Sequence, residues 1–352
     1  MATPDPYAPI IKLAVLVNLA RERARQAELP EGRQEQLQIL AHRIHRIRSL
    51  QEGKDTKIRV GVFGAPKRGK STLLNALLGE ELMPTAQVPL STTTIEIERD
   101  TSIPGRRVII DHPSGRIEER DCKSAQEVAK LLETYGSRRG TSESALRLRL
   151  KGDFPDCKIL AEGGVLLDTP GAEVAFEPDK KLAAEAQRAL DALKSTHLVL
   201  FCMRADQIGS RSDSELYEKH VRSLAPVHVV TMKDKYEGDI GNLIDDVLKN
   251  YGLTQAEPTL VSAHQAMSDE TLGISGMAQF EEKVLREIGR ITPEHGLLSC
   301  LRNFELAAED FSEIRPERIH FMNLYGEIEG LNNDWSSEAI KHMRSKPEFW
   351  KL

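Results

Sequence analysis

The chain has 352 residues, of which 40% are hydrophobic and 29% are charged, and its formal net charge is −6 at pH 7. This balance is typical of a globular protein with more than one domain, and it gives no general attraction for nucleic acid, so we expect no nucleic-acid partner. The four cysteines lack the spacing of a metal site (Cys122, Cys157, Cys202 and Cys300), and we expect reduced thiols in a cytoplasmic protein.

The first 52 residues have helical patterning. Residues 9–52 predict two helices that are interrupted at residues 29–32, where the sequence is LPEG. In the second helix, apolar side chains recur at spacings of three and four: Leu37, Leu40, Ile44 and Ile47. Such a face needs a partner, because isolated helices gain little stability from propensity alone. We expect this partner to be helices elsewhere in the chain rather than a membrane.

From residue 57 to about residue 291, predicted strands and helices alternate, which favours an α/β fold with a mostly parallel sheet covered on both faces. The predicted strands are 58–63, 93–99, 107–111, 145–150, 163–167, 196–203, 226–231 and 258–262. The predicted helices are 70–78, 124–134, 179–194, 211–224, 238–250 and 278–290, with Ser124 and Ser212 as N-caps. The longest apolar stretch, residues 197–203, has the length of a strand and is too short to span a membrane.

Helical patterning returns at residues 297–345, with breaks expected at Pro316 and Gly330. We therefore expect three regions: N-terminal helices (1–54), an α/β domain (55–292) and C-terminal helices (293–352).

A loop with two glycines follows the first predicted strand of the α/β domain. Residues 59–79 read RVGVFGAPKRGKSTLLNALLG, which contains the pattern G-x-x-x-x-G-K-[ST] of phosphate-binding loops. Glycine lets several backbone N–H groups converge on one anion, and the following helix N-terminus adds partial positive charge. Lys70 would reach the β- and γ-phosphates, and the Ser71 hydroxyl would ligate Mg²⁺. The predicted nucleotide-binding residues are Gly64, Ala65, Pro66, Lys67, Arg68, Gly69, Lys70, Ser71 and Thr72.

A second motif, DTPG, follows another apolar strand and has the D-x-x-G pattern of GTPase switch II. Asp168 at the strand end can hold Mg²⁺ through water. The Gly171 N–H can bond the γ-phosphate, so the segment after it senses whether that phosphate is present. Because DTPG follows a phosphate-binding loop in the chain, an ordinary proline–glycine turn is the less favoured interpretation.

A run of hydroxyl residues lies between these two motifs, in MPTAQVPLSTTTIEIERD. A hydroxyl just before a strand at this place could supply switch I, ligating Mg²⁺ and orienting the attacking water. Ser91 and Thr94 compete for this role with the two residues that we favour, Thr92 and Thr93, and we take Thr92 as the metal ligand. The alternative is that these threonines are present for their β-propensity.

Two short motifs near the end of the domain suggest base recognition. The predicted strand at 226–231 ends in Thr231, Met232, Lys233 and Asp234. A carboxylate there can accept both N1–H and N2–H₂ of guanine, a pairing that adenine does not offer. After the next strand, the dipeptide Ser262-Ala263 could present a backbone N–H to guanine O6. The dipeptide Ser262-Ala263 indicates a base-binding segment only because of its position after the other motifs.

The order of GAPKRGKS, DTPG, TMKD and VSA resembles the dynamin superfamily of large GTPases, and the bacterial dynamin-like branch most closely. The long insert before LLDTPGAE and the segment LVLFCMRADQIGSRSDSELYEKH add to this resemblance, which covers residues 55–265. The resemblance implies a GTP-hydrolysing enzyme with Mg²⁺, a homodimer or higher oligomer formed through the GTPase domains, and flanking helices that form a bundle. The resemblance also suggests that the protein contacts a membrane peripherally and remodels it.

The sequence departs from the family pattern at three places. Met232 replaces the lysine of the usual [NT]-K-x-D motif, so that TMKD is similar to the form in guanylate-binding proteins and atlastins. Lys67 lies where guanylate-binding proteins place a catalytic arginine, and we expect Lys67 or Arg68 to neutralise charge on the phosphoryl oxygens when two domains meet. Only about 60 residues follow the domain, whereas family members that remodel membranes have a long helical region there. We therefore expect either a fragment of a longer protein or a minimal member of the family.

Two alternatives stay open from the sequence. The first is a nucleotide-gated scaffold that hydrolyses GTP slowly and works by presenting a surface to a partner, without remodelling membranes. The second is an ATPase, because a phosphate-binding loop alone does not distinguish the two nucleotides.

Overall fold

The structure is a computed structural model that describes residues 57–85, 93–136, 145–170, 189–224, 226–253, 258–268 and 270–289, with scattered positions between 14 and 45. The chain divides into two compact units. One is Thr56–Arg290, and the other combines Met1–Asp55 with Ile291–Leu352.

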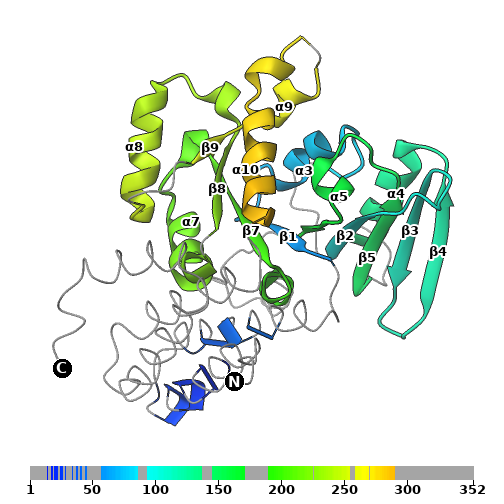
Figure 1. The fold of residues 1–352 in the computed structure, drawn as a ribbon, viewed down its shortest axis with the longest axis horizontal. Coiled ribbons are helices and arrows are strands. Elements are labelled where there is room, and N and C mark those ends of the chain that lie inside the picture. Colours follow the sequence, from blue (N-terminus) through cyan, green and yellow to red (C-terminus); the bar gives the residue numbers. More distant parts are fainter. Residues whose placement is uncertain are drawn as a thin grey trace, which may run out of the picture. The chain divides into compact units, whose positions relative to one another are not determined.

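A nine-stranded mixed sheet forms the centre of the unit Thr56–Arg290 (Figure 1), with the strand order β4-β3-β5-β2-β6-β1-β7-β8-β9. The strands are β1 (Arg59–Phe63), β2 (Thr94–Arg99), β3 (Arg106–Asp111), β4 (Ile117–Cys122), β5 (Arg147–Gly152), β6 (Val165–Asp168), β7 (Leu198–Arg204), β8 (Val227–Thr231) and β9 (Thr259–Leu260). Five of the eight strand pairings are parallel, and β2·β6, β3·β4 and β3·β5 are antiparallel. The prediction of an α/β fold with a mostly parallel sheet is confirmed.

The most buried strands are the central ones. Val60, Val62 and Phe63 of β1 are fully buried, as is most of β7, because a parallel strand that is covered on both faces has no polar side and reads as a continuous apolar run. This is why the sequence predicts these strands to within two residues. Three of the four cysteines, Cys122, Cys157 and Cys202, are free and buried, and Cys300 lies outside the described residues.

One strand was not predicted. β4 has the sequence IEERDC and forms the edge of the sheet, where it pairs only with β3. Its outward side chains make ion pairs, such as that of Asp121 with Arg107 on the neighbouring strand β3. Charged residues are common on edge strands, because they discourage pairing with another chain. They also remove the apolar alternation that sequence patterning depends on.

The helices confirm most of the predicted positions. They are α3 (Lys70–Leu78), α4 (Ala125–Gly136), α5 (Lys158–Ala161), α7 (Arg211–Leu216), α8 (Ile240–Tyr251), α9 (Ala263–Ala266) and α10 (Met277–Gly289). The helix predicted at 179–194 is helical over 189–194, and its earlier part lies outside the described residues. α5 and α9 are single turns, too short to give a periodic pattern.

Two details of the predicted helices need correction. Ser124 does cap its helix, because its Oγ accepts a hydrogen bond from Glu127 N, but Ser212 does not cap α7. The N-cap is Ser210, whose Oγ accepts from Asp213 N. The single helix predicted at 211–224 is α7 followed by a π-helical turn at Tyr217–Val221 and a 3₁₀ turn at Arg222–Leu224.

In the second unit, every described position from 14 to 26 and from 34 to 45 is helical. Leu37, Leu40 and Ile44 are buried, which confirms the predicted apolar stripe as far as it is described. Ile47 and the helices predicted at 297–345 lie outside the described residues. No helix in the described part of the chain combines the length and apolar character needed to cross a bilayer.

Candidate functional site

The predicted motifs gather at one edge of the sheet. β1, β6, β7, β8 and β9 are adjacent and parallel, so their carboxyl ends lie along the same edge. The phosphate-binding loop follows β1, DTPG begins at the last residue of β6, and TMKD begins at the last residue of β8. In open α/β sheets, ligands bind at the carboxyl ends of the strands.

The loop from Gly64 to Lys70 turns through backbone conformations that its sequence permits. Gly64 has φ 155°, and a Cβ there would lie 2.6 Å from the carbonyl oxygen of Cys202. Gly69 has φ 76° and precedes α3 as its N-cap residue, where its carbonyl accepts the first helical hydrogen bond from Leu73 N at 2.8 Å. Both positions therefore require glycine. Lys67 is exposed and also adopts a left-handed conformation, with φ 60°.

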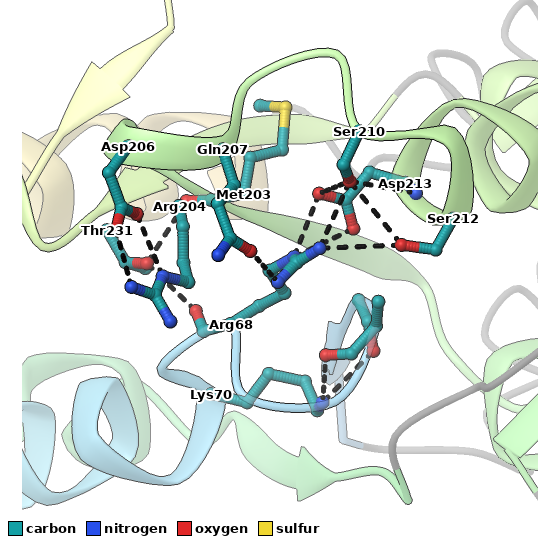
Figure 2. A network of polar contacts seen from close by, with 12 residues as sticks. Arg68, Lys70, Met203, Arg204, Asp206, Gln207, Ser210, Ser212, Asp213 and Thr231 are labelled. Atoms are coloured by element: carbon teal, nitrogen blue, oxygen red, sulfur yellow. Dashed lines mark hydrogen bonds and ion pairs between the residues drawn. The ribbon is translucent and has the colours of Figure 1, made fainter.

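Lys70 lies folded under this loop. Its ammonium is buried and donates hydrogen bonds to the carbonyl oxygens of Gly64 and Ala65, each at 3.0 Å (Figure 2). Burial lowers the pKa of Lys70 below its ordinary value of 10.5, and the nearby Asp168 opposes this shift. A buried cation of this kind is placed to bind the anionic oxygens of a phosphate.

Ser71 and Asp168 bring a hydroxyl and a carboxylate together. Ser71 Oγ donates to Asp168 Oδ2 at 3.0 Å. The other carboxylate oxygen, Oδ1, is buried and has no hydrogen-bond partner among the described residues. Hydroxyl and carboxylate oxygens, or the waters they hold, are the ligands that Mg²⁺ prefers. Ser71 and Asp168, two of the three residues predicted to hold the metal, therefore fit Mg²⁺. The unpartnered Asp168 Oδ1 would be satisfied by this cation or by a water that it holds.

The buried carboxylate has an altered acidity. Burial raises the pKa of Asp168 from 3.8 to about 6, against the opposing effects of Lys70 and the Ser71 hydrogen bond. Because this acid holds its proton more tightly in the folded chain, its stabilising contribution is complete below pH 3.8 and is lost as the pH rises through about 6. Without nucleotide or metal, we expect the free energy of unfolding to fall across this range by roughly 3 kcal/mol.

Chemical denaturation across this pH range checks the prediction. The matched control is Asp168→Asn, which keeps the side-chain shape and has no carboxyl group to titrate. The difference in unfolding free energy between wild type and this variant should decrease steadily from pH 4 to pH 6. A difference that does not change with pH would contradict the raised pKa.

Two threonine hydroxyls form hydrogen bonds that connect the elements at this edge of the sheet. Thr169, which follows β6, donates to the carbonyl oxygen of Val62 in β1 at 2.7 Å. Thr231, at the end of β8, lies within hydrogen-bond distance of the carbonyl oxygens of Arg68 (2.8 Å) and Met203 (3.0 Å). The predicted base motif is thus tied directly to the phosphate-binding loop. This gives Thr231 a connecting role that its sequence position alone did not reveal.

The rest of the base motif lies beside the loop. Met232 has φ 58°, and its methyl group lies 3.6 Å from where a Cβ on Gly69 would be. Lys233 N donates to the carbonyl oxygen of Val261 at 3.2 Å, which joins this motif to the segment after β9. Asp234 is exposed. The carboxylate is therefore accessible to a base near the loop.

Ser262 and Ala263 follow β9. The Ser262 hydroxyl accepts from Gln265 N at 3.1 Å and so caps α9, which packs against α3. The Val261 carbonyl that precedes Ser262 is the one bonded by Lys233. The structure therefore brings the two predicted base-binding segments together, with α3 beside them.

Arg68 is placed differently from Lys67. The residue is 7% exposed, and its guanidinium forms an ion pair with Asp213, at 2.8 Å between Nε and Oδ2. Of the two cations predicted to act on the phosphoryl oxygens, Lys67 is the exposed one. The expectation for Arg68 does not fit this placement, because the guanidinium is bonded within the protein. Asp213 belongs to no motif, so that this pair has no local signal in the sequence.

The predicted switch residues are only partly described. Thr93 is buried, and its hydroxyl donates to the carbonyl oxygen of Ala145 at 2.8 Å. This bond fixes the start of β2, where Thr94 is the first residue. Ser91, Thr92 and Gly171 lie outside the described residues.

Comparison with known proteins identifies the relatives of this chain. A sequence model of the dynamin family matches residues 60–234. "Dynamin-like protein 2" of Campylobacter jejuni is 26% identical over 201 residues, which are 56% of this chain and 29% of that protein. The "Bacterial dynamin-like protein" of Nostoc punctiforme is 28% identical over 243 residues, which are 67% of this chain and 32% of that protein. The chain thus spans under a third of the length of these curated relatives.

A solved structure supports the same fold. It is described as an oligomerised bacterial dynamin pair that provides a mechanism for the long-range sensing and tethering of membranes. The similarity covers 99% of this chain and 52% of that chain, with a TM-score of 0.51 and 14% sequence identity.

Proposed function

The chain belongs to the dynamin superfamily, and we propose that it is a GTPase that binds GTP with Mg²⁺ and hydrolyses the γ-phosphate. The observation that carries the proposal is the meeting of Lys70, Ser71 and Asp168 at the carboxyl ends of β1 and β6. A buried ammonium, a hydroxyl and a carboxylate with one unpartnered oxygen suit a triphosphate with its metal ion.

We assign roles in hydrolysis to residues of this chain. Backbone N–H groups of residues 64–72 cradle the phosphates, and Lys70 moves from the loop carbonyls to the β- and γ-phosphates. Ser71 and Asp168 would hold Mg²⁺, and the ion would supply positive charge for the phosphate oxygens. The Gly171 N–H contacts the γ-phosphate, and Thr92 orients the water for in-line attack, because the Thr93 hydroxyl is buried and bonded to the Ala145 carbonyl. No strong base is needed, since positioning and electrostatics carry most of phosphoryl transfer.

Guanine is the base that the site fits best. Asp234 accepts hydrogen bonds from guanine N1–H and N2–H₂, while Thr231 holds the motif against the loop. The Met232 side chain beside Gly69, with the aliphatic part of Lys233, covers the base. A backbone N–H at Ser262-Ala263 meets O6.

We further propose that two GTPase domains dimerise across the nucleotide, in the cytoplasm or peripherally at a membrane. The exposed position of Lys67 on the loop supports this, because a cation there can be pressed toward the phosphates by a second domain. The regions 1–54 and 293–352 would form the helical bundle that responds to the nucleotide. A structural relative described as an oligomerised pair that tethers membranes supports oligomerisation and peripheral membrane contact.

GTP turnover measured against protein concentration tests this proposal. The specific activity should rise with concentration for wild type, and Lys67→Ala should lose most of that rise while keeping GTP binding. Lys249→Ala, which removes an exposed lysine from α8, is the matched control and should behave as wild type.

The other outcomes decide between the open alternatives. A very slow rate that does not depend on concentration would support a nucleotide-gated scaffold. Turnover of ATP as fast as GTP would overturn the assignment of guanine. An unchanged rise in Lys67→Ala would exclude this lysine from the stimulated reaction.

A further inference from the structure

Arg68 joins the phosphate-binding loop to the segment that follows β7 (Figure 2). Its Nε donates to both carboxylate oxygens of Asp213, at 3.0 and 2.8 Å. Its Nη1 donates to Gln207 Oε1 at 2.6 Å, and its Nη2 donates to Ser210 Oγ at 3.0 Å. The guanidinium therefore has partners on three sides, all of them from residues 207–213.

The carboxylate partner is itself built into α7. Asp213 is 0% exposed, and its Oδ2 also accepts from the hydroxyl of Ser210, the N-cap of this helix. The same carboxylate thus fixes the start of α7 and the side chain of Arg68. Such a network is fully satisfied only when all its members are present, because one partner alone would be an uncompensated buried charge.

The backbone of residue 68 is held as firmly as its side chain. Its carbonyl accepts from the Thr231 hydroxyl at 2.8 Å. Its two neighbours both have left-handed backbones, with φ 60° at Lys67 and φ 76° at Gly69. A left-handed lysine is costly and persists only where the surroundings impose it. In this loop, Arg68 restricts the backbone of Lys67. The Arg68 side chain is bonded to the segment after β7, and the Arg68 carbonyl is bonded to Thr231 at the end of β8.

We propose that Arg68 and Asp213 form an internal strut that positions the phosphate-binding loop for a nucleoside di- or triphosphate. Arg68 is then a positioning residue, which acts through the shape of residues 64–70 and does not touch the phosphates. This inference rests on the proposed function and deepens it, since it assigns the segment RADQIGSRSD a part in binding. It also predicts that GTP and GDP depend on the strut equally, because both contact the same loop.

The test compares single and double substitutions. Arg68→Met alone leaves the Asp213 carboxylate buried without its partner, so that this variant is expected to unfold easily. The double variant Arg68→Met/Asp213→Leu removes both charges, and replacing a buried ion pair by apolar residues often leaves stability unchanged. Arg68→Lys keeps the positive charge and can donate to fewer of the partners of Arg68. Its nucleotide affinity should therefore lie between those of Arg68→Met and wild type.

The matched control is the double variant Arg59→Met/Glu96→Leu. This pair, with 3.2 Å between Arg59 Nη2 and Glu96 Oε1, lies at the first residue of β1, the end of the strand away from the loop. It should leave nucleotide affinity unchanged.

Two measurements are made on the full chain. The first is the Kd for GTP and GDP, with kcat at saturating GTP. In Arg68→Met/Asp213→Leu both Kd values should rise about 10- to 100-fold, whereas kcat should change less than about threefold, because a misplaced loop weakens binding of both nucleotides alike. The second is hydrogen exchange without nucleotide, in which residues 64–72 should exchange at least about tenfold faster than in wild type, with the rest of the domain unchanged.

The outcomes separate the strut from the proposed function. Unchanged exchange of the loop in the folded double variant would overturn the strut, whatever happens to affinity. Faster exchange with unchanged Kd values would also overturn it, since the loop would then not need positioning. If wild type binds no guanine nucleotide but the loop still loses protection in the double variant, the strut stands as a loop-positioning device and the proposed function fails.

Discussion

Replacing Lys70 with alanine is expected to weaken binding of Mg²⁺·GTP by about 100- to 1000-fold and to abolish measurable turnover. The ammonium is buried beneath the loop and is bonded to the carbonyl oxygens of Gly64 and Ala65. Truncating one partner of a buried, hydrogen-bonded charge pair costs about 2–5 kcal/mol, and roughly 3–4 kcal/mol corresponds to this loss of affinity. Isothermal titration calorimetry with a slowly hydrolysed GTP analogue measures it.

The control for this variant is Lys249→Ala, on the exposed side of α8. Thermal unfolding of both variants shows whether the domain remains folded. Lys70→Ala also removes a buried charge, so that its stability should not fall greatly. A folded Lys70→Ala protein that binds GTP as tightly as wild type would exclude this loop as the phosphate site.

Changing Asp234 to asparagine is expected to reverse the preference for the base. In the proposed site the carboxylate would accept from guanine N1–H and N2–H₂, whereas an asparagine amide can accept from N1–H and donate to an oxygen at position 2. Xanthine has that oxygen. Affinity for GTP should fall by about 100-fold, and affinity for xanthosine triphosphate should rise, because a site built for one hydrogen-bond pattern strongly rejects the other.

Competition binding with GTP, ATP and xanthosine triphosphate measures this change. Asp245→Asn, which alters an exposed aspartate on α8, is the matched control and should retain the wild-type order of affinities. If Asp234→Asn keeps GTP affinity and gains nothing for xanthosine triphosphate, then TMKD does not recognise the base.

The fold was predictable where burial leaves a local pattern. Strands such as β1 and β7 are apolar runs because helices and neighbouring strands exclude water from them, and the phosphate-binding loop has fixed residues because its turns need glycine. β4 was missed because an edge strand needs no apolar face. The sequence does not distinguish Ser210 from Ser212 as the cap of α7, because two serines two residues apart give the same signal.

The motifs of the site could be predicted from the sequence, but the long-range side-chain contacts between them could not. Lys70, Ser71 and Asp168 were expected together, because the order of two motifs implies adjacent strands. The pairing of Arg68 with Asp213 spans 145 residues and follows no motif. Long-range pairs of this kind depend on how β1 and β7 lie side by side, which no local spacing encodes. For the same reason the Thr93 hydroxyl, bonded to Ala145, could not be distinguished in the sequence from its neighbours.

The proposed GTPase activity depends most on a magnesium-dependent triphosphate site built from Lys70, Ser71 and Asp168. Calorimetric titration of the purified full chain with a slowly hydrolysed GTP analogue, with Mg²⁺ and then with chelator, tests it most directly. We predict one nucleotide per chain and a loss of at least about tenfold in affinity when Mg²⁺ is removed. Folded protein that takes up no GTP analogue in the presence of Mg²⁺ would contradict the account.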